Sequence, residues 1–287
     1  MKRHSGRGVA AVYGVAVVAL ASSPIPGTPL IRSALADTDE GTVVCTVASL
    51  RGGFVVSVNG FVTLNGQGDT SPNGTLSEFT PVMEIGTFAF DGAGTVSRAV
   101  TVSVGGIPFP VNDIGTYVTN ADCSGSIAFP TNSDTFNFNV VDEDSIAIVP
   151  MKLGQSGAGT LTRQRIRDCS AETFRGTYVF SVNGLGTGLP VPPPPPTDGF
   201  FPVSVIGTWD FDGKGGVTRS LSLSYDGYPF PYSDTGTYQV NSDCTLSAYF
   251  PSDTEAFQII AIDANRLVQG VVTTGRVGAG TLVRQRR

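Results

Sequence analysis

The sequence predicts an all-β protein made of two tandem eight-stranded antiparallel meander barrels. Three observations predict this fold: a composition rich in glycine and poor in charge, a unit of about 120 residues that occurs twice, and short segments in which apolar and small polar residues alternate. Glycine supplies 36 of the 287 residues. Charged residues supply 15% of the chain, against roughly 25% in an average domain.

The repeat is visible by direct comparison of the sequence with itself. CTVASLRGGFVVSVNG begins at Cys45 and CSAETFRGTYVFSVNG begins at Cys169. IGTFAFDGAGTVSR begins at Ile85 and IGTWDFDGKGGVTR begins at Ile206, and GAGTLTRQR returns later as GAGTLVRQR at the same spacing. A unit of this length is that of a domain rather than of a solenoid repeat. The expected divisions are a signal peptide (1–36), a short acidic lead (37–44), a first barrel repeat (45–165), a linker (166–168) and a second barrel repeat (169–287).

Each repeat contains about eight segments with the alternation and turn residues of β-strands. The segment VSRAVTVSV, which starts at Val96, places apolar side chains on one face and small polar ones on the other. Closing eight such strands into a barrel removes the two exposed edges of an open sheet. Two β-sandwiches are the alternative fold. The strands are expected near 53–59, 83–90, 95–104, 114–119, 124–129, 135–141, 145–151 and 157–165, and near 177–183, 202–211, 216–225, 235–240, 245–250, 256–262, 266–273 and 278–286.

The first residues have the pattern of a cleaved signal peptide. Three basic residues precede an apolar stretch over 8–20, and Ala34-Leu35-Ala36 offers a small-x-small cleavage site. Ala19-Leu20-Ala21 is a second site, and a retained signal anchor is the rival interpretation. Cleavage after Ala36 leaves 14 basic and 24 acidic residues, a net charge of −10. This charge argues against a nucleic-acid partner, and no transmembrane span is expected in the mature chain.

The four cysteines are expected to form one bridge in each repeat. Cys45–Cys123 and Cys169–Cys244 give both copies the same pairing, and an oxidising compartment after export favours disulfides. Four free thiols or a metal site are the alternatives, although no Cys-x-x-Cys spacing occurs. We therefore expect no metal and no cofactor.

Histidine chemistry is excluded, because the only histidine is His4, inside the predicted signal peptide. Mechanisms that need a Ser-His or Cys-His pair therefore have no base. An enzyme would have to work with carboxylates, tyrosine or arginine. No motif asks for such an activity, so a non-enzymatic role is the favoured hypothesis.

Arg98 and Arg219 are matched between the repeats and lie on the apolar face of the third predicted strand. One interpretation is structural, with each head group paired to Asp91 or Asp212 or reaching water. The other is a ligand anchor in the barrel mouth that recognises a carboxylate. The structural interpretation is favoured, because buried charges are usually paired within the protein.

Each repeat also resembles the calycin barrels, the lipocalin-like group. Those barrels begin with Gly-x-Trp and end with an arginine that packs across the aromatic ring. Here residues 52–54 and 176–178 read Gly-x-aromatic without the tryptophan, and Arg163 and Arg284 lie on the last predicted strands. The resemblance implies the barrel fold, and Arg163 and Arg284 carry the same two interpretations, structural or ligand-binding.

Three functions are compatible with these observations. The first is an exported binding module for a small apolar or acidic ligand, and the second is a structural or surface interaction protein with filled barrels. The third is a histidine-free barrel isomerase, which a perturbed carboxylate inside a cavity would favour. The Pro192–Pro196 run is expected to form a stiff loop, either as a lid or as a docking site.

We predict that the secreted or periplasmic form begins at Asp37. The reason is the order of basic start, apolar run and small-x-small site. Intact-mass measurement of the protein from its native host should give the chain that begins at Asp37, and a chain that retains Met1 would contradict the prediction.

Overall fold

The computed structural model describes residues 45–63, 79–152, 154–187, 200–225, 227–252 and 255–286. The predicted signal peptide, the acidic lead and the Pro192–Pro196 loop lie outside the described residues. Among those residues no helix has the length and apolar character needed to cross a membrane.

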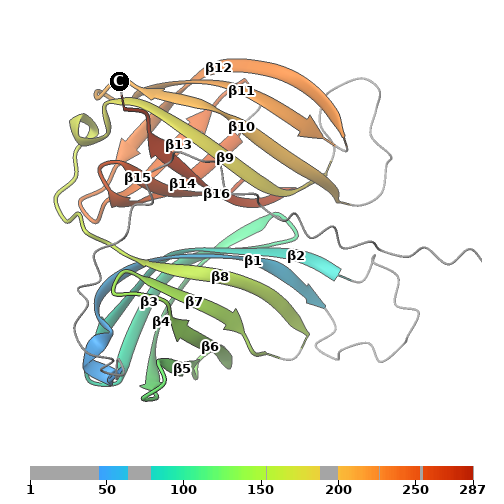
Figure 1. Ribbon diagram of the computed structural model, residues 1–287. Helices are drawn as coiled ribbons and strands as arrows, with labels where there is room; N and C mark the ends of the chain where they lie inside the picture. The colour runs from blue at the N-terminus through green and yellow to red at the C-terminus, as the bar shows by residue number, and fades with distance from the viewer. Residues whose placement is uncertain are drawn as a thin grey trace, which may run out of the picture. The chain divides into compact units, whose positions relative to one another are not determined.

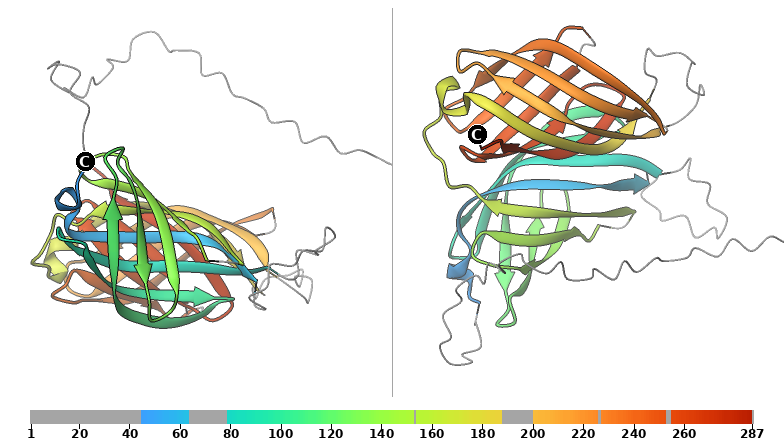
Figure 2. Two further views of the ribbon diagram at one scale, coloured as in Figure 1. Left: turned by 90° about the horizontal axis from the view of Figure 1, so that it is seen from below. Right: turned by 45° about the horizontal axis from the view of Figure 1, so that its top comes forward.

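Two closed antiparallel barrels form the structure, as the sequence predicts, and the sandwich alternative is wrong. Consecutive strands pair around each barrel, and the last strand pairs with the first. Figure 1 shows β1–β8 curling into one barrel and β9–β16 into the other, and both views in Figure 2 show the slanted strands of closed barrels. The first barrel consists of β1 (Arg51–Thr63), β2 (Phe79–Asp91), β3 (Thr95–Val104), β4 (Ile107–Thr119), β5 (Ser124–Phe129), β6 (Asp134–Val140), β7 (Ser145–Pro150) and β8 (Gln155–Arg163). The second consists of β9 (Gly176–Gly186), β10 (Phe201–Phe211), β11 (Gly216–Tyr225), β12 (Tyr228–Val240), β13 (Thr245–Phe250), β14 (Glu255–Asp263), β15 (Arg266–Val271) and β16 (Arg276–Arg284).

The fourth strand of each repeat is longer than expected. β4 begins at Ile107 rather than near 114, and β12 begins at Tyr228 rather than near 235. The added part of β4 contains Pro108 and Pro110, which cannot donate to a ladder. The first part of β4 pairs with β3, however, and its register with β5 begins only at Thr116. Proline is tolerated on such a free edge.

Large side chains fill the closed end of each barrel. A 3₁₀ turn covers this end in each repeat, η1 (Val47–Ser49) in the first and η3 (Ala171–Phe174) in the second. The hydroxyl group of Tyr117 donates to the carbonyl of Val47 at 2.9 Å, and Tyr238 donates to Ala171 at 3.1 Å. These turns were not expected from the sequence, because three or four residues are too few for a helical period.

The disulfides join Cys45 to Cys123 and Cys169 to Cys244, as the repeat predicts. Each bridge ties the segment before the first strand to the turn between the fourth and fifth strands of its barrel. The bridges close loops of 78 and 75 residues, for which chain entropy gives a stabilisation of about 4–5 kcal/mol each.

Outward-facing apolar residues of the two repeats share one buried cluster. Val55, Met83 and Ile85 contribute from the first repeat, and Ile260, Ile262, Val268, Val277 and Ala279 contribute from the second. The side-chain amide of Gln164 also donates to the carbonyl of Ala261 at 3.0 Å. Burial of this apolar area explains why β2 and β14 are apolar on both faces.

Candidate functional site

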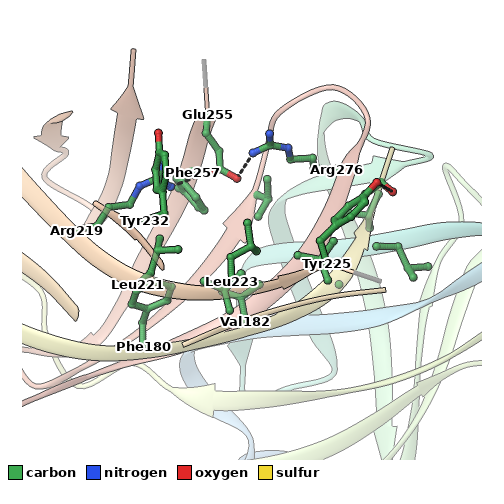
Figure 3. A pocket seen from close by; sticks show the side chains of 18 of the residues that line it. Phe180, Val182, Arg219, Leu221, Leu223, Tyr225, Tyr232, Glu255, Phe257 and Arg276 are labelled. Carbon is green, nitrogen blue, oxygen red and sulfur yellow. Dashed lines mark hydrogen bonds and ion pairs between the residues drawn. The ribbon is translucent and has the colours of Figure 1, made fainter. Parts of the chain in front are cut away.

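A cavity of about 360 Å³ lies inside the second barrel. Its wall is mainly apolar, with Phe180, Val182, Leu221, Leu223 and Phe257 among the lining residues. These side chains come from β9, β11 and β14, whose alternation turns every second residue inward. Figure 3 shows the aliphatic residues on one wall of the cavity, with Arg219, Tyr232, Glu255 and Arg276 along another.

The polar wall contains an ion cluster of four residues, which we call the inner cluster: Arg219, Asp234, Glu255 and Arg276. The β11–β12 register places Arg219 directly opposite Asp234. Arg219 donates from Nε to Oδ1 of Asp234 at 2.6 Å and from Nη2 to Oδ2 at 3.0 Å, a bidentate pair. Glu255 accepts from Arg219 through one oxygen and from Arg276 through the other.

The two arginines of this cluster differ in how deeply their side chains are buried. The side chain of Arg219 is 2% exposed, whereas that of Arg276 is 18% exposed. The Arg219 guanidinium also stacks on Phe250, with its central carbon 3.9 Å from the ring centroid. Among the described residues, two cations and two anions balance in this cluster, and Arg219 is held by the protein itself.

The first barrel has a related but different arrangement. Arg98 forms the same bidentate pair with Asp113, from Nε at 2.6 Å and from Nη2 at 3.1 Å. Its Nη2 also donates to Asp134 at 2.6 Å, the counterpart of Glu255. Arg276 has Gln155 as its counterpart in the repeat, so the first barrel lacks the second guanidinium.

Glu84 is the additional acid of the first barrel, where the second barrel has Val205. Its Oε1 lies 3.6 Å from Nη1 of Arg98 and has no hydrogen-bond partner among the described residues. Burial raises the pKa of Glu84 from 4.5 to about 7, although the positive charge of Arg98 acts in the opposite direction. The carboxylates of Asp134 and Asp113 raise it further.

The prediction that these arginines pair with Asp91 and Asp212 is wrong. Arg98 and Arg219 face the barrel interior with Val100 and Leu221, as the alternation predicts. Asp91 and Asp212, however, are exposed and accept main-chain N–H bonds within their own hairpins. Those bonds lower the pKa of both carboxyl groups.

A sequence signal for the true partners exists. An aspartate follows each arginine after 15 residues and another acid follows after 36, in both repeats. The hairpin aspartates are nearer in sequence, but the strand register decides which side chains meet.

Arg163 and Arg284 lie at the far ends of β8 and β16, away from the cavity. The guanidinium carbon of Arg163 is 4.5 Å from the Phe54 ring centroid, and that of Arg284 is 5.3 Å from Tyr178. Arg163 donates to the carbonyls of Arg51 at 2.6 Å and Glu143 at 2.8 Å. This is the packing that the calycin resemblance implies. A ligand role for these two arginines stays a prediction.

Comparison with known proteins adds nothing to the fold and the site described above. No protein-family profile matches the sequence, and no curated protein has significant similarity to it. Among solved structures, a protein of unknown function from the DUF3598 family of Nostoc punctiforme aligns with 84% of this chain and 99% of its own, at 11% identity and a TM-score of 0.24. A porin-like protein from Bacteroides uniformis aligns with 86% of this chain and 100% of its own, at 10% identity and a TM-score of 0.22. Similarity at this level says nothing about function.

We predict that Arg98→Met destabilises the protein by about 3–5 kcal/mol, because it leaves the buried carboxylate of Asp113 without its cation, whereas Asp134 keeps its ion pair with Lys152. Urea denaturation measures the loss. Arg175→Met is the matched control, since the Arg175 side chain is 67% exposed and its ion pair contributes at most about 1 kcal/mol. Equal effects of the two substitutions would contradict the structural role of Arg98.

We predict that the wild-type protein becomes less stable as the pH rises from about 5 to about 8. The stability of the Glu84→Gln variant should not fall in this way. The Glu84 carboxyl group ionises near pH 4.5 when unfolded but near pH 7 when folded. Its stabilising protonated form is therefore lost as the pH rises through this window, at a cost of up to about 3 kcal/mol.

Urea denaturation at both pH values tests this prediction. In the form that begins at Asp37, which lacks His4, the cysteines are bridged, so no other side chain with an ordinary pKa titrates in the window. The same pH dependence in wild type and variant would show that Glu84 is not the titrating group.

Proposed function

We propose that this is an exported, non-enzymatic protein whose second barrel binds one small, mainly apolar ligand. The observation that carries the proposal is the 360 Å³ cavity inside that barrel. Its volume lies within the range of about 300–1,000 Å³ found for small-molecule sites. An eight-stranded barrel is also just wide enough to hold one small ligand. The two disulfides support export, since such bonds persist in oxidising compartments.

The ligand that fits this cavity is neutral. The inner cluster is balanced in charge, and the donors of Arg219 go to Asp234 and Glu255. A carboxylate at this place would have to displace one of these acids. Among the four arginines considered from the sequence, Arg219 is the one that lines the cavity, and its role is to hold the polar wall rather than to anchor an anion.

The isomerase alternative has weaker support. The carboxyl group with the raised pKa, Glu84, belongs to the first barrel, whereas the described cavity belongs to the second. Among the described residues, the perturbed acid and this cavity therefore lie in different barrels. The cavity likewise argues against the alternative in which both barrels are filled.

We predict that the protein binds one equivalent of the neutral fluorophore N-phenyl-1-naphthylamine in the second barrel, and that Leu223→Trp abolishes binding. Leu223 lines the cavity, and an indole ring there fills the space that the probe needs. Fluorescence titration measures both the affinity and the stoichiometry.

Val102→Trp is the matched control, because Val102 is the counterpart of Leu223 in the first repeat. This variant should bind the fluorophore as the wild type does. Loss of binding in Val102→Trp but not in Leu223→Trp would place the site in the first barrel and contradict the proposal. An absence of binding by the wild type would overturn the proposal as well.

A further inference from the structure

Gln269 is a polar residue in the interior of the second barrel. It lies on β15 between Leu267 and Val271, which both belong to the buried core of that barrel. Side chains two apart on a strand share a face, so the Gln269 side chain points inward with them. Its exposure is 0%.

The amide of Gln269 makes no hydrogen bond within the described part of the chain. Neither Nε2 nor Oε1 has a partner there. A primary amide offers two donors and an acceptor, and leaving a buried polar group unpaired is costly in protein interiors. A partner from outside the protein would remove that cost.

The first barrel shows that the fold does not require a polar residue here. The counterpart of Gln269 is Ile148, which is buried and apolar. A second buried polar group without a partner also replaces an apolar residue of the first barrel. Trp209, whose Nε1 also lacks a partner among the described residues, has Phe88 as its counterpart. Both polar groups therefore belong to the barrel that contains the cavity.

Gln269 does not itself line that cavity but lies next to residues that do. Val271, the next inward residue of β15, lines the cavity. Across the sheet, Gln269 pairs with Gly280, and Gly280 pairs with Val182, another lining residue. A side chain at position 280 is impossible, because its Cβ would lie 1.9 Å from the carbonyl oxygen of Ser181. No side chain therefore stands between Gln269 and Val182.

Trp209 adjoins the same wall from the other side. Its ring lies 5.1 Å from that of Phe257 and 5.8 Å from that of Phe180, measured between centroids. Both phenylalanines line the cavity. The cavity thus has a balanced ion cluster on one wall, an aliphatic opposite wall (Figure 3), and orphan hydrogen-bonding groups behind its inner end.

We infer that the ligand of the second barrel carries a neutral amide-type head group that enters first and hydrogen-bonds to the Gln269 side chain. An amide both donates and accepts, so it can satisfy Nε2 and Oε1 of Gln269 together. The apolar body of the ligand then lies against the aliphatic wall. This inference rests on the proposed function, since it names the class of ligand for the same cavity.

The test uses displacement of N-phenyl-1-naphthylamine from the full-length protein by octanamide. Its isostere 2-methylnon-1-ene, which lacks the donor and the acceptor, is the comparison ligand. Gln269→Ile, which copies the residue of the first barrel, should weaken octanamide about tenfold, or about 1.4 kcal/mol. The fluorophore and the hydrocarbon should keep their affinities within about twofold, because the substitution removes only the hydrogen bonds that the amide makes with residue 269.

Two further variants keep the outcome interpretable. Gln269→Met preserves the length of the side chain and should behave as Gln269→Ile does, which covers the case in which isoleucine does not fit. Ile148→Gln in the first barrel should leave octanamide binding unchanged.

The outcomes separate the two proposals. Failure of the fluorophore to bind the wild type would overturn the proposed function itself. Binding of the fluorophore without competition by octanamide, or an octanamide affinity unchanged by both Gln269 variants, would overturn the inference about the head group and leave the cavity as a purely apolar site.

Discussion

The buried bidentate pair between the third and fourth strands is the interaction on which each barrel depends. An arginine inside a protein is tolerated only when its donors are satisfied by acids or carbonyls. Arg98 meets this condition through Asp113, and Arg219 meets it through Asp234, with side chains that are almost fully buried. A second acid, Asp134 or Glu255, reaches the same guanidinium from β6 or β14. Three strands that are not all neighbours are thereby held at one level of the barrel.

The two repeats use this shared frame differently. In the first barrel, Glu84 adds an acid beside Arg98 and Lys152 pairs with Asp134, whereas in the second barrel Arg276 pairs with Glu255 and no extra acid is added among the described residues. The second barrel consequently has a balanced cluster next to an open space, and its deeper interior exchanges Phe88 and Ile148 for the polar Trp209 and Gln269. Duplication of one domain followed by changes at a few inward positions accounts for the difference between the two interiors.

Much of the fold could be predicted because each strand assignment in one copy of the repeat can be compared with the other copy. The alternation around Val96, the matched hairpins and the four cysteines led to two eight-stranded barrels with one bridge each. The partners of Arg98 were missed, because they depend on register rather than on nearness in sequence, although acids 15 and 36 residues after the arginine recur in both repeats. Gln269 was overlooked, although a lone glutamine in the run RLVQGVV stands out at an inward position. The cavity could not be predicted at all, because it depends on how side chains of many strands fill one volume.

The prolines of the fourth strands have a consequence for association between molecules. Part of β4, before its pairing with β5 begins, has one free edge, and an exposed edge is a template for a strand of another chain. Pro108 and Pro110 are two residues apart, so both of their ring nitrogens lie along the same edge and deprive it of two donors. Pro229 and Pro231 repeat the arrangement on β12. Each barrel can therefore keep a strand projecting beyond its closed wall without that strand recruiting a second copy of the protein by edge-to-edge pairing.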